Sequence, residues 1–225
     1  ERSPGEWFRR PLEHGDCYET GESSSRISRD MILGVMFYAY YTKDIKMLND
    51  LWDYGTENSW IMGKVKEADN SLASLMSSNY IALLAKMLYK LDNKDYAARY
   101  SPIVLDNNCE GFTCHLLTLY LLLLGDVQGL NNTQIDILRA VSERNPNNLL
   151  YAAAVIKYGI NRPLILDDRL YPDHRLPNTN DRCEGWIIQR DDNDTKAHTG
   201  PCWDNRPFHI HSGGDLIFID WLLKN

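Results

Sequence analysis

Within residues 17–41, carboxylates and guanidinium groups gather in the first half, and the second half is almost unbroken apolar sequence. Glycoside hydrolysis needs two carboxyl groups about 5–10 Å apart, one protonated as the acid and the other ionised as the base or nucleophile. We predict Glu22 as the general acid, with Asp30 or Glu19 as its charge partner. Arg26 or Arg29 would lower the pKa of a nearby carboxylate. We therefore expect the general acid to be the carboxyl group farther from these arginines.

Helix capping is the simpler interpretation of any single acid in this stretch. Ser28 can accept a hydrogen bond from the free amides of a first helical turn. Asp30 would then lie where the helix dipole favours an anion. Glu19 and Glu22 have no such capping role, so the catalytic hypothesis depends mainly on Glu22.

Side chains suited to holding a sugar occur near this stretch and toward the C-terminus. Aromatic rings can line a binding site, and a few polar groups can orient the ligand. The substrate-binding candidates are Tyr18, Arg29, Trp186, Trp203, His209, His211 and Asp215. Core packing is the simpler role for either tryptophan alone. His209 and His211, with Asp215, could instead bind a divalent metal if the segment is extended; we favour substrate contact and predict no metal site and no cofactor.

Helical periodicity predicts an all-α protein of seven or eight helices arranged as consecutive antiparallel pairs. No run has the alternation and length of a sheet strand. The expected helices cover residues 28–43, 44–55, 71–91, 111–125, 132–144, 147–159 and 213–225, with caps at Asp44, Asn132 and Asn147 and a capping box at Ser212 and Asp215. The apolar residues of 28–43 lie on nearly all faces, which predicts a helix buried on several sides.

Two segments lack any sustained period. Residues 1–27 form an irregular N-terminal arm, and residues 162–212 are rich in Pro, Asp and Asn. A structureless loop of that length is uncommon in a compact domain. We therefore predict a single helical domain over residues 1–225, with 162–212 as an irregular flap over one end of the helices.

Composition excludes some classes of protein. The 225-residue chain carries a net charge of −7 without a basic stripe, which argues against a nucleic-acid binder. The most apolar run, residues 116–124, is far shorter than the ~20 residues that span a bilayer, so no membrane span is expected.

The five cysteines bear on the compartment. Cys109 with Cys114 and Cys183 with Cys202 are close enough in sequence to form two local disulfides, which leaves Cys17 as a free thiol. Disulfides indicate an oxidising compartment, so we expect a secreted or periplasmic protein. A cytosolic protein with five reduced thiols is the alternative.

The run GESSSRISRDMILGVMFYAYYTKDIKMLNDLWDYGTENSW, about forty residues, resembles the glycoside hydrolases with (α/α) barrels, of the bacterial cellulase and chitosanase type. Glu22, Gly34 and Leu51–Trp52 stand in places comparable to that family's acid and its first two helices. The resemblance implies a partial (α/α) toroid-like array of paired helices more than it implies a specific reaction.

These observations predict a carbohydrate-active enzyme, a glycoside hydrolase acting on a cell-wall or capsular polysaccharide. The acidic balance favours a neutral or amino-sugar substrate over a polyanion. One alternative is a polysaccharide lyase, for which Tyr18, His209 or His211 could supply the base. The other is a non-enzymatic helical module that binds a glycan or a protein.

Overall fold

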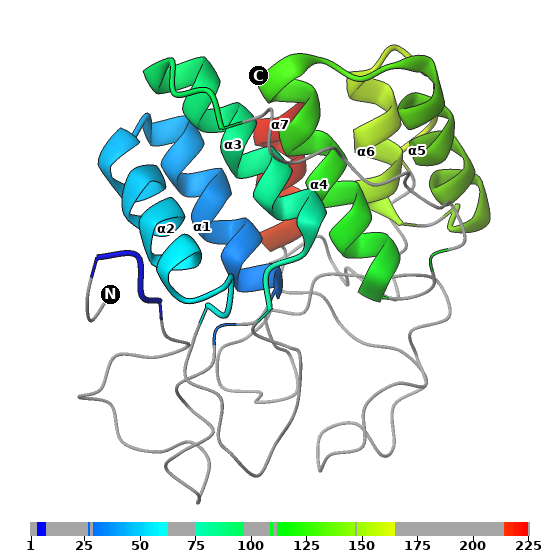
Figure 1. Ribbon diagram of the computed structural model, residues 1–225. Coiled ribbons are helices and arrows are strands. Elements are labelled where there is room, and N and C mark those ends of the chain that lie inside the picture. Colours follow the sequence, from blue (N-terminus) through cyan, green and yellow to red (C-terminus); the bar gives the residue numbers. More distant parts are fainter. Residues whose placement is uncertain are drawn as a thin grey trace, which may run out of the picture. The chain divides into compact units, whose positions relative to one another are not determined.

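The part of the chain that the computed structural model describes is built of α-helices joined by turns and short irregular segments (Figure 1). That part comprises residues 4–7, 27, 29–62, 75–96, 109, 112–146, 148–164 and 214–224. Its helices are α1 (Arg29–Thr42), α2 (Ile45–Glu57), α3 (Ser78–Asp92), α4 (Phe112–Gln128), α5 (Asn132–Arg144), α6 (Leu149–Lys157) and α7 (Gly214–Lys224). Between the described residues the only extended pairing is an isolated bridge of Ile61 with Leu75. The all-α prediction is confirmed.

The chain divides into two compact units. Unit 1 comprises Glu1–Val104 and Leu123–Gly129, and unit 2 comprises Leu105–Leu122 and Leu130–Asn225. Helix α4 therefore starts in unit 2 and ends in unit 1. The single helical domain remains a prediction, and each unit is described by itself below.

Unit 1 is built on the hairpin of α1 and α2. Lys43 adopts a left-handed conformation (φ 55°), and the Asp44 carboxylate then accepts a hydrogen bond from the Met47 amide at 2.9 Å, as predicted for a cap. The apolar face of α2 packs against both α1 and α3. Fully or nearly fully buried side chains of this unit include Ile32, Leu33, Met36, Leu48, Leu51, Leu83 and Leu84.

Helix α1, which the sequence predicts to be buried on several sides, has both buried and exposed positions. Ile32, Leu33 and Met36 are fully buried, whereas Tyr38 is 58% exposed and Tyr41 is also exposed. Tyrosine combines an apolar ring with a hydroxyl that water can solvate, so it occupies a surface position at little cost. A hydropathy pattern that counts tyrosine as apolar therefore does not distinguish these exposed positions from the buried ones.

Helix α3 begins later than the predicted start near residue 71. Its N-cap is Ser77, whose hydroxyl accepts from the Tyr80 amide. The residues just before it are extended, because Leu75 pairs with Ile61 and the Met76 amide donates to the Trp60 carbonyl at 2.9 Å. These contacts with the turn that follows α2 replace the helical conformation predicted for residues 75–77.

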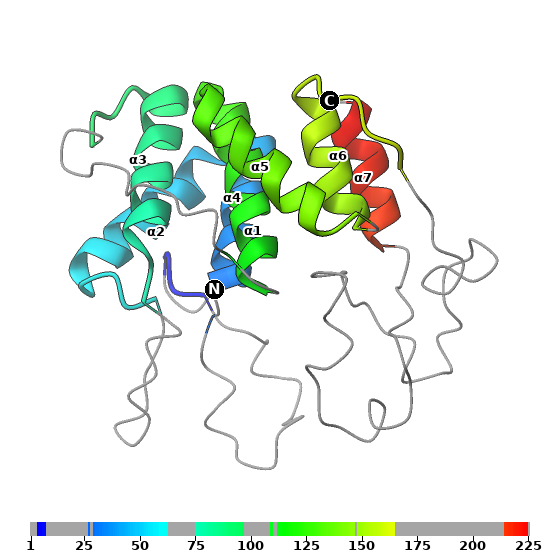
Figure 2. The same ribbon diagram turned by 90° about the vertical axis from the view of Figure 1, so that its right-hand side faces the viewer.

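Unit 2 contains α5, α6 and α7 together with the first part of α4. Helix α6 packs against α5 and α7, and Figure 2 shows α6 and α7 side by side. Asn131, not Asn132, caps α5, in a reciprocal capping box with Gln134. Asn148 caps α6, whereas the predicted Asn147 lies outside the described residues, as do Ser28 and Ser212. No described helix is both long and apolar enough to cross a membrane.

Candidate functional site

The predicted site residues fall mostly outside the described residues. This is so for Glu19 and Glu22 and for the binding candidates Tyr18, Trp186, Trp203, His209 and His211. Arg29 and Asp30 lie in the first turn of α1, where the Arg29 side chain is exposed. Asp215 lies in the first turn of α7. The starts of both helices are therefore as the sequence predicted, whereas the placing of the acids relative to one another remains a prediction.

One end of unit 1 brings several helix termini together. The start of α1, the end of α2 and the start of α3 lie at the same end of this antiparallel group (Figure 1). Ile27, just before α1, is only 2% exposed. The chain that carries the predicted acids therefore enters the helical core at this end.

The turn that follows α2 is strained. Ser59 and Trp60 both have left-handed backbones, with φ of 53° and 64°. This region is costly for a bulky residue, by about 1–3 kcal/mol, and such residues are concentrated at functional sites. The Trp60 ring lies over Gly55, where an added Cβ would come within 2.5 Å of it. Glycine at position 55 is therefore what admits the ring.

Three aromatic rings gather beside this turn, and we call them the α2 aromatic cluster: Trp52, Trp60 and Tyr96. The Trp52 and Tyr96 rings stack with centroids 4.2 Å apart, and Trp60 meets Trp52 edge-on at 5.1 Å. Trp52 is 4% exposed, whereas Trp60 and Tyr96 are half-buried. Trp52 therefore belongs to the core, and only the other two rings offer surface to a ligand.

The N-terminal arm supplies a carboxylate that the sequence analysis missed. Residues 4–7 lie against α2, with Gly5 (φ 78°) so close to the Asp50 carbonyl that no side chain would fit. The buried Glu6 carboxylate accepts a hydrogen bond from the Tyr54 hydroxyl. Burial raises the pKa of Tyr54, and the charge and hydrogen bond of Glu6 raise it further. The Pro4–Gly5 turn is a local sequence signal for this docking.

A group of polar contacts in unit 1 surrounds Asp126, near the end of α4. Its backbone carbonyl accepts from the Tyr40 hydroxyl at 2.9 Å and from Lys90 Nζ at 2.8 Å. The Tyr41 hydroxyl donates to its carboxylate. Lys90 also lies 5.8 Å from the centre of the Tyr40 ring, within cation–π range. These contacts join α1, α3 and the end of α4 within unit 1.

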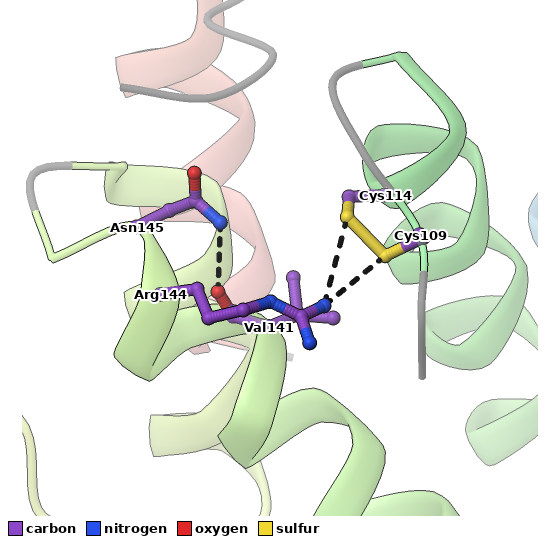
Figure 3. Close-up of a disulfide and its surroundings, with 5 residues drawn as sticks. All are labelled: Cys109, Cys114, Val141, Arg144 and Asn145. Carbon is purple, nitrogen blue, oxygen red and sulfur yellow. Dashed lines mark hydrogen bonds between the residues drawn. A yellow bond between two sulfur atoms is a disulfide. The ribbon is translucent and has the colours of Figure 1, made fainter. Parts of the chain in front are cut away.

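Unit 2 contains the first of the two predicted disulfides, between Cys109 and Cys114 (Figure 3). Arg144, in the last turn of α5, donates from Nη2 toward both sulfur atoms, at 3.6 Å to Cys109 and 4.0 Å to Cys114. The predicted Cys183–Cys202 pair and Cys17 lie outside the described residues. The disulfide prediction is thus confirmed for one pair.

No metal site is evident among the residues that the structure describes, because no three His, Cys, Asp or Glu side chains there lie close enough to share an ion. His209 and His211 are not among those residues, so the metal alternative for them stays untested.

Comparison of the chain with protein-family models, with curated proteins and with solved structures found no match.

Proposed function

We propose that the protein is a carbohydrate-active enzyme, a glycoside hydrolase that cleaves a cell-wall or capsular polysaccharide by carboxylate acid–base chemistry. The observation that carries the proposal is the crowded end of unit 1. There the first turn of α1 shares one end of the helices with the strained Trp60 turn. Residues held in sparsely populated backbone regions cluster at active sites and ligand-binding sites.

The short chain length between Glu22 and the start of α1 also supports the proposal. The chain from Glu22 to Ile27 spans at most about 18 Å. Because Ile27 is buried at the start of the helical core, Glu22 is within reach of this end of unit 1. Asp30 follows in the first turn of α1.

We propose the following roles for these residues. Glu22 is the general acid, and Asp30 or Glu19 is the second carboxylate. Trp60 and Tyr96 are added to the earlier substrate-binding candidates, because their rings are partly accessible in unit 1. We further propose a partial (α/α) toroid-like arrangement and a polysaccharide substrate. We also propose a secreted or periplasmic location, which the Cys109–Cys114 disulfide supports because disulfides persist in oxidising compartments.

A glycan panel tests the proposal. Purified protein is incubated with neutral and amino-sugar polymers, including peptidoglycan and its deacetylated form, and new reducing ends are measured together with the absorbance of 4,5-unsaturated sugars. A hydrolase produces reducing ends without that absorbance.

The other outcomes overturn the proposal in distinct ways. Reducing ends with the unsaturated absorbance would assign the protein to the polysaccharide lyases. Binding of a polymer without cleavage would make it a non-enzymatic module. Loss of hydrolysis after exhaustive chelation would contradict the metal-free chemistry and would favour the alternative in which His209 and His211 bind a divalent metal.

A further inference from the structure

The Cys109–Cys114 disulfide lies against a cation. Arg144 Nη2 is 3.6 Å from Cys109 Sγ and 4.0 Å from Cys114 Sγ, so one guanidinium group contacts both sulfur atoms (Figure 3). Neutral disulfide sulfurs are weak hydrogen-bond acceptors, whereas a thiolate beside Arg gains a charge-assisted interaction. The arrangement therefore stabilises the reduced, ionised form more than the disulfide.

The position of Cys114 in α4 acts in the same direction. Cys114 is the third residue of the helix, where the helix dipole places partial positive charge. Helix N-termini and neighbouring arginines are among the environments that favour thiolates in proteins. Cys114 has both.

The two sulfur atoms differ in access. Cys114 is 2% exposed, whereas Cys109 is half-buried and precedes the helix. An incoming thiolate therefore reaches Cys109 more easily, and Cys114 is the better leaving group because its charge is stabilised.

The disulfide also closes a very short loop. The cysteines are 5 residues apart, so the covalent link removes little chain entropy from the unfolded state compared with a long loop. Less stability is thus lost when it opens than when a disulfide that closes a long loop opens. A disulfide of this kind is suited to reversible reduction.

We propose that Cys109 and Cys114 form a reversible redox pair, in which a dithiol reductant attacks Cys109 and Cys114 leaves as a thiolate held by Arg144 and the first turn of α4. This inference is independent of the proposed glycan chemistry. The partner class is a dithiol, either a small molecule or a protein of the dithiol oxidoreductase type.

The exchange balances as follows. A thiolate of the dithiol forms a bond to Cys109 Sγ, and the Cys109–Cys114 bond breaks with its electron pair on Cys114. The second thiolate of the reductant then attacks the reductant's first sulfur atom, which is bonded to Cys109 in the mixed disulfide, and Cys109 is released. The protein gains two electrons, the dithiol becomes a cyclic disulfide, and its two protons go to Cys109 and to solvent.

The redox equilibrium of the native protein tests the proposal. The protein is equilibrated with defined ratios of reduced and oxidised dithiothreitol, free thiols are trapped by alkylation, and each cysteine is quantified by mass spectrometry. Arg144→Gln is expected to lower the equilibrium constant for reduction of the pair about tenfold, which is about 30 mV for a two-electron couple. Arg144→Lys, which keeps the charge, is expected to lie between Arg144→Gln and the wild type.

Arg139→Gln is the matched control. Arg139 lies in the same helix but pairs with Asp136 at 3.0 Å, so its removal should leave the equilibrium unchanged. If Arg144→Gln fails to fold, the wild type is measured at rising ionic strength, where screening of Arg144 should shift the pair toward the disulfide. Equal equilibria in the wild type and Arg144→Gln, or reduction only after unfolding, would overturn the proposal.

The attacked sulfur is identified separately. A monothiol such as glutathione leaves a mixed disulfide on the attacked cysteine, and cleavage after Glu110 separates the two cysteines into different peptides. The adduct is expected on Cys109. An adduct mainly on Cys114 would contradict the assignment of the leaving group.

Discussion

The two units are fastened in different ways. In unit 1, α1 and α3 are tied to the end of α4 by non-covalent contacts to Asp126, from Tyr40, Tyr41 and Lys90. In unit 2 a disulfide joins Cys109 to α4, and Arg162 donates to the carbonyl of the fully buried Ser142 at 2.6 Å. Water competes with the first kind of contact far more than with the second.

This difference in contacts indicates which interactions stabilise each unit. The contacts of unit 1 to Asp126 are exposed or only partly buried, so each adds little and the unit depends on its apolar core. Unit 2 adds a covalent link and buried polar groups to its core. Asn148, which is fully buried, caps α6 in this way.

Removing core volume from unit 1 should have the largest effect. Leu83 is fully buried in α3, so Leu83→Ala is expected to lower the free energy of unfolding by about 3 kcal/mol, through lost transfer energy and a residual cavity. Urea denaturation measures the change. Leu75→Ala, at a side chain that is 38% exposed, is the control and should change it by less than a third as much. Similar effects of the two variants would contradict the dependence on the core.

High pH should act on the interior of unit 2. Burial raises the pKa of Tyr120 to about 12 from its ordinary value of 10.0. The folded protein thus keeps a proton that the unfolded chain releases above pH 10. The resulting stability is complete below pH 10 and is lost as pH rises toward 12, by about 3 kcal/mol.

The pH dependence of unfolding checks this prediction. Tyr120→Phe should remove that part of the decline between pH 10 and 12, as measured by urea denaturation at each pH. Tyr89→Phe is the control, because Tyr89 is 57% exposed, and it should retain the full decline. A decline that is the same in all three proteins would show that Tyr120 is not its cause.

Opening the disulfide should have an intermediate effect. The double variant Cys109→Ser, Cys114→Ser is expected to lower the free energy of unfolding by about 2 kcal/mol, the entropy of so short a loop. The wild type in excess dithiol should lose the same amount at this site, and the double variant should not respond there. A loss above about 5 kcal/mol would mean that the disulfide is a major structural support, contrary to its proposed reversible opening.

The smallest effect is expected at Asp126. Tyr40→Phe removes the hydroxyl that donates to the Asp126 carbonyl, at a cost of about 1 kcal/mol or less. Tyr38→Phe, at a 58% exposed position of the same helix, is the matched control and should be neutral. A loss at Tyr40 as large as that for Leu83→Ala would reverse the comparison between the polar contacts and the core.

Periodicity predicted the existence of the helices well, because each has an apolar face with the spacing of a helix. Boundaries that depend on long-range contacts were less predictable. The start of α3 is fixed by contacts of Leu75 and Met76 with the turn that follows α2, which no local pattern contains. The cap of α5 was misplaced by one position because Asn131 and Asn132 are equally good caps in isolation.

The candidate site was predictable only in part. The first turn of α1 holds Arg29 and Asp30, as the capping pattern indicated. Glu6 and Trp60 were missed, because their environments depend on tertiary contacts with Tyr54 and Gly55. The left-handed backbone of Trp60 also contradicts the preference of its residue type, so sequence pattern alone does not reveal it.

The central claim is that Glu22 is the general acid, and the hydrolysis rate of Glu22→Gln tests it most directly. On a polymer that the wild type cleaves, Glu22→Gln is expected to slow the formation of reducing ends by about 10²-fold or more, with unfolding by urea unchanged. Glu57→Gln, an exposed acid at the end of α2, should hydrolyse at the wild-type rate. A near-normal rate for Glu22→Gln would contradict the claim.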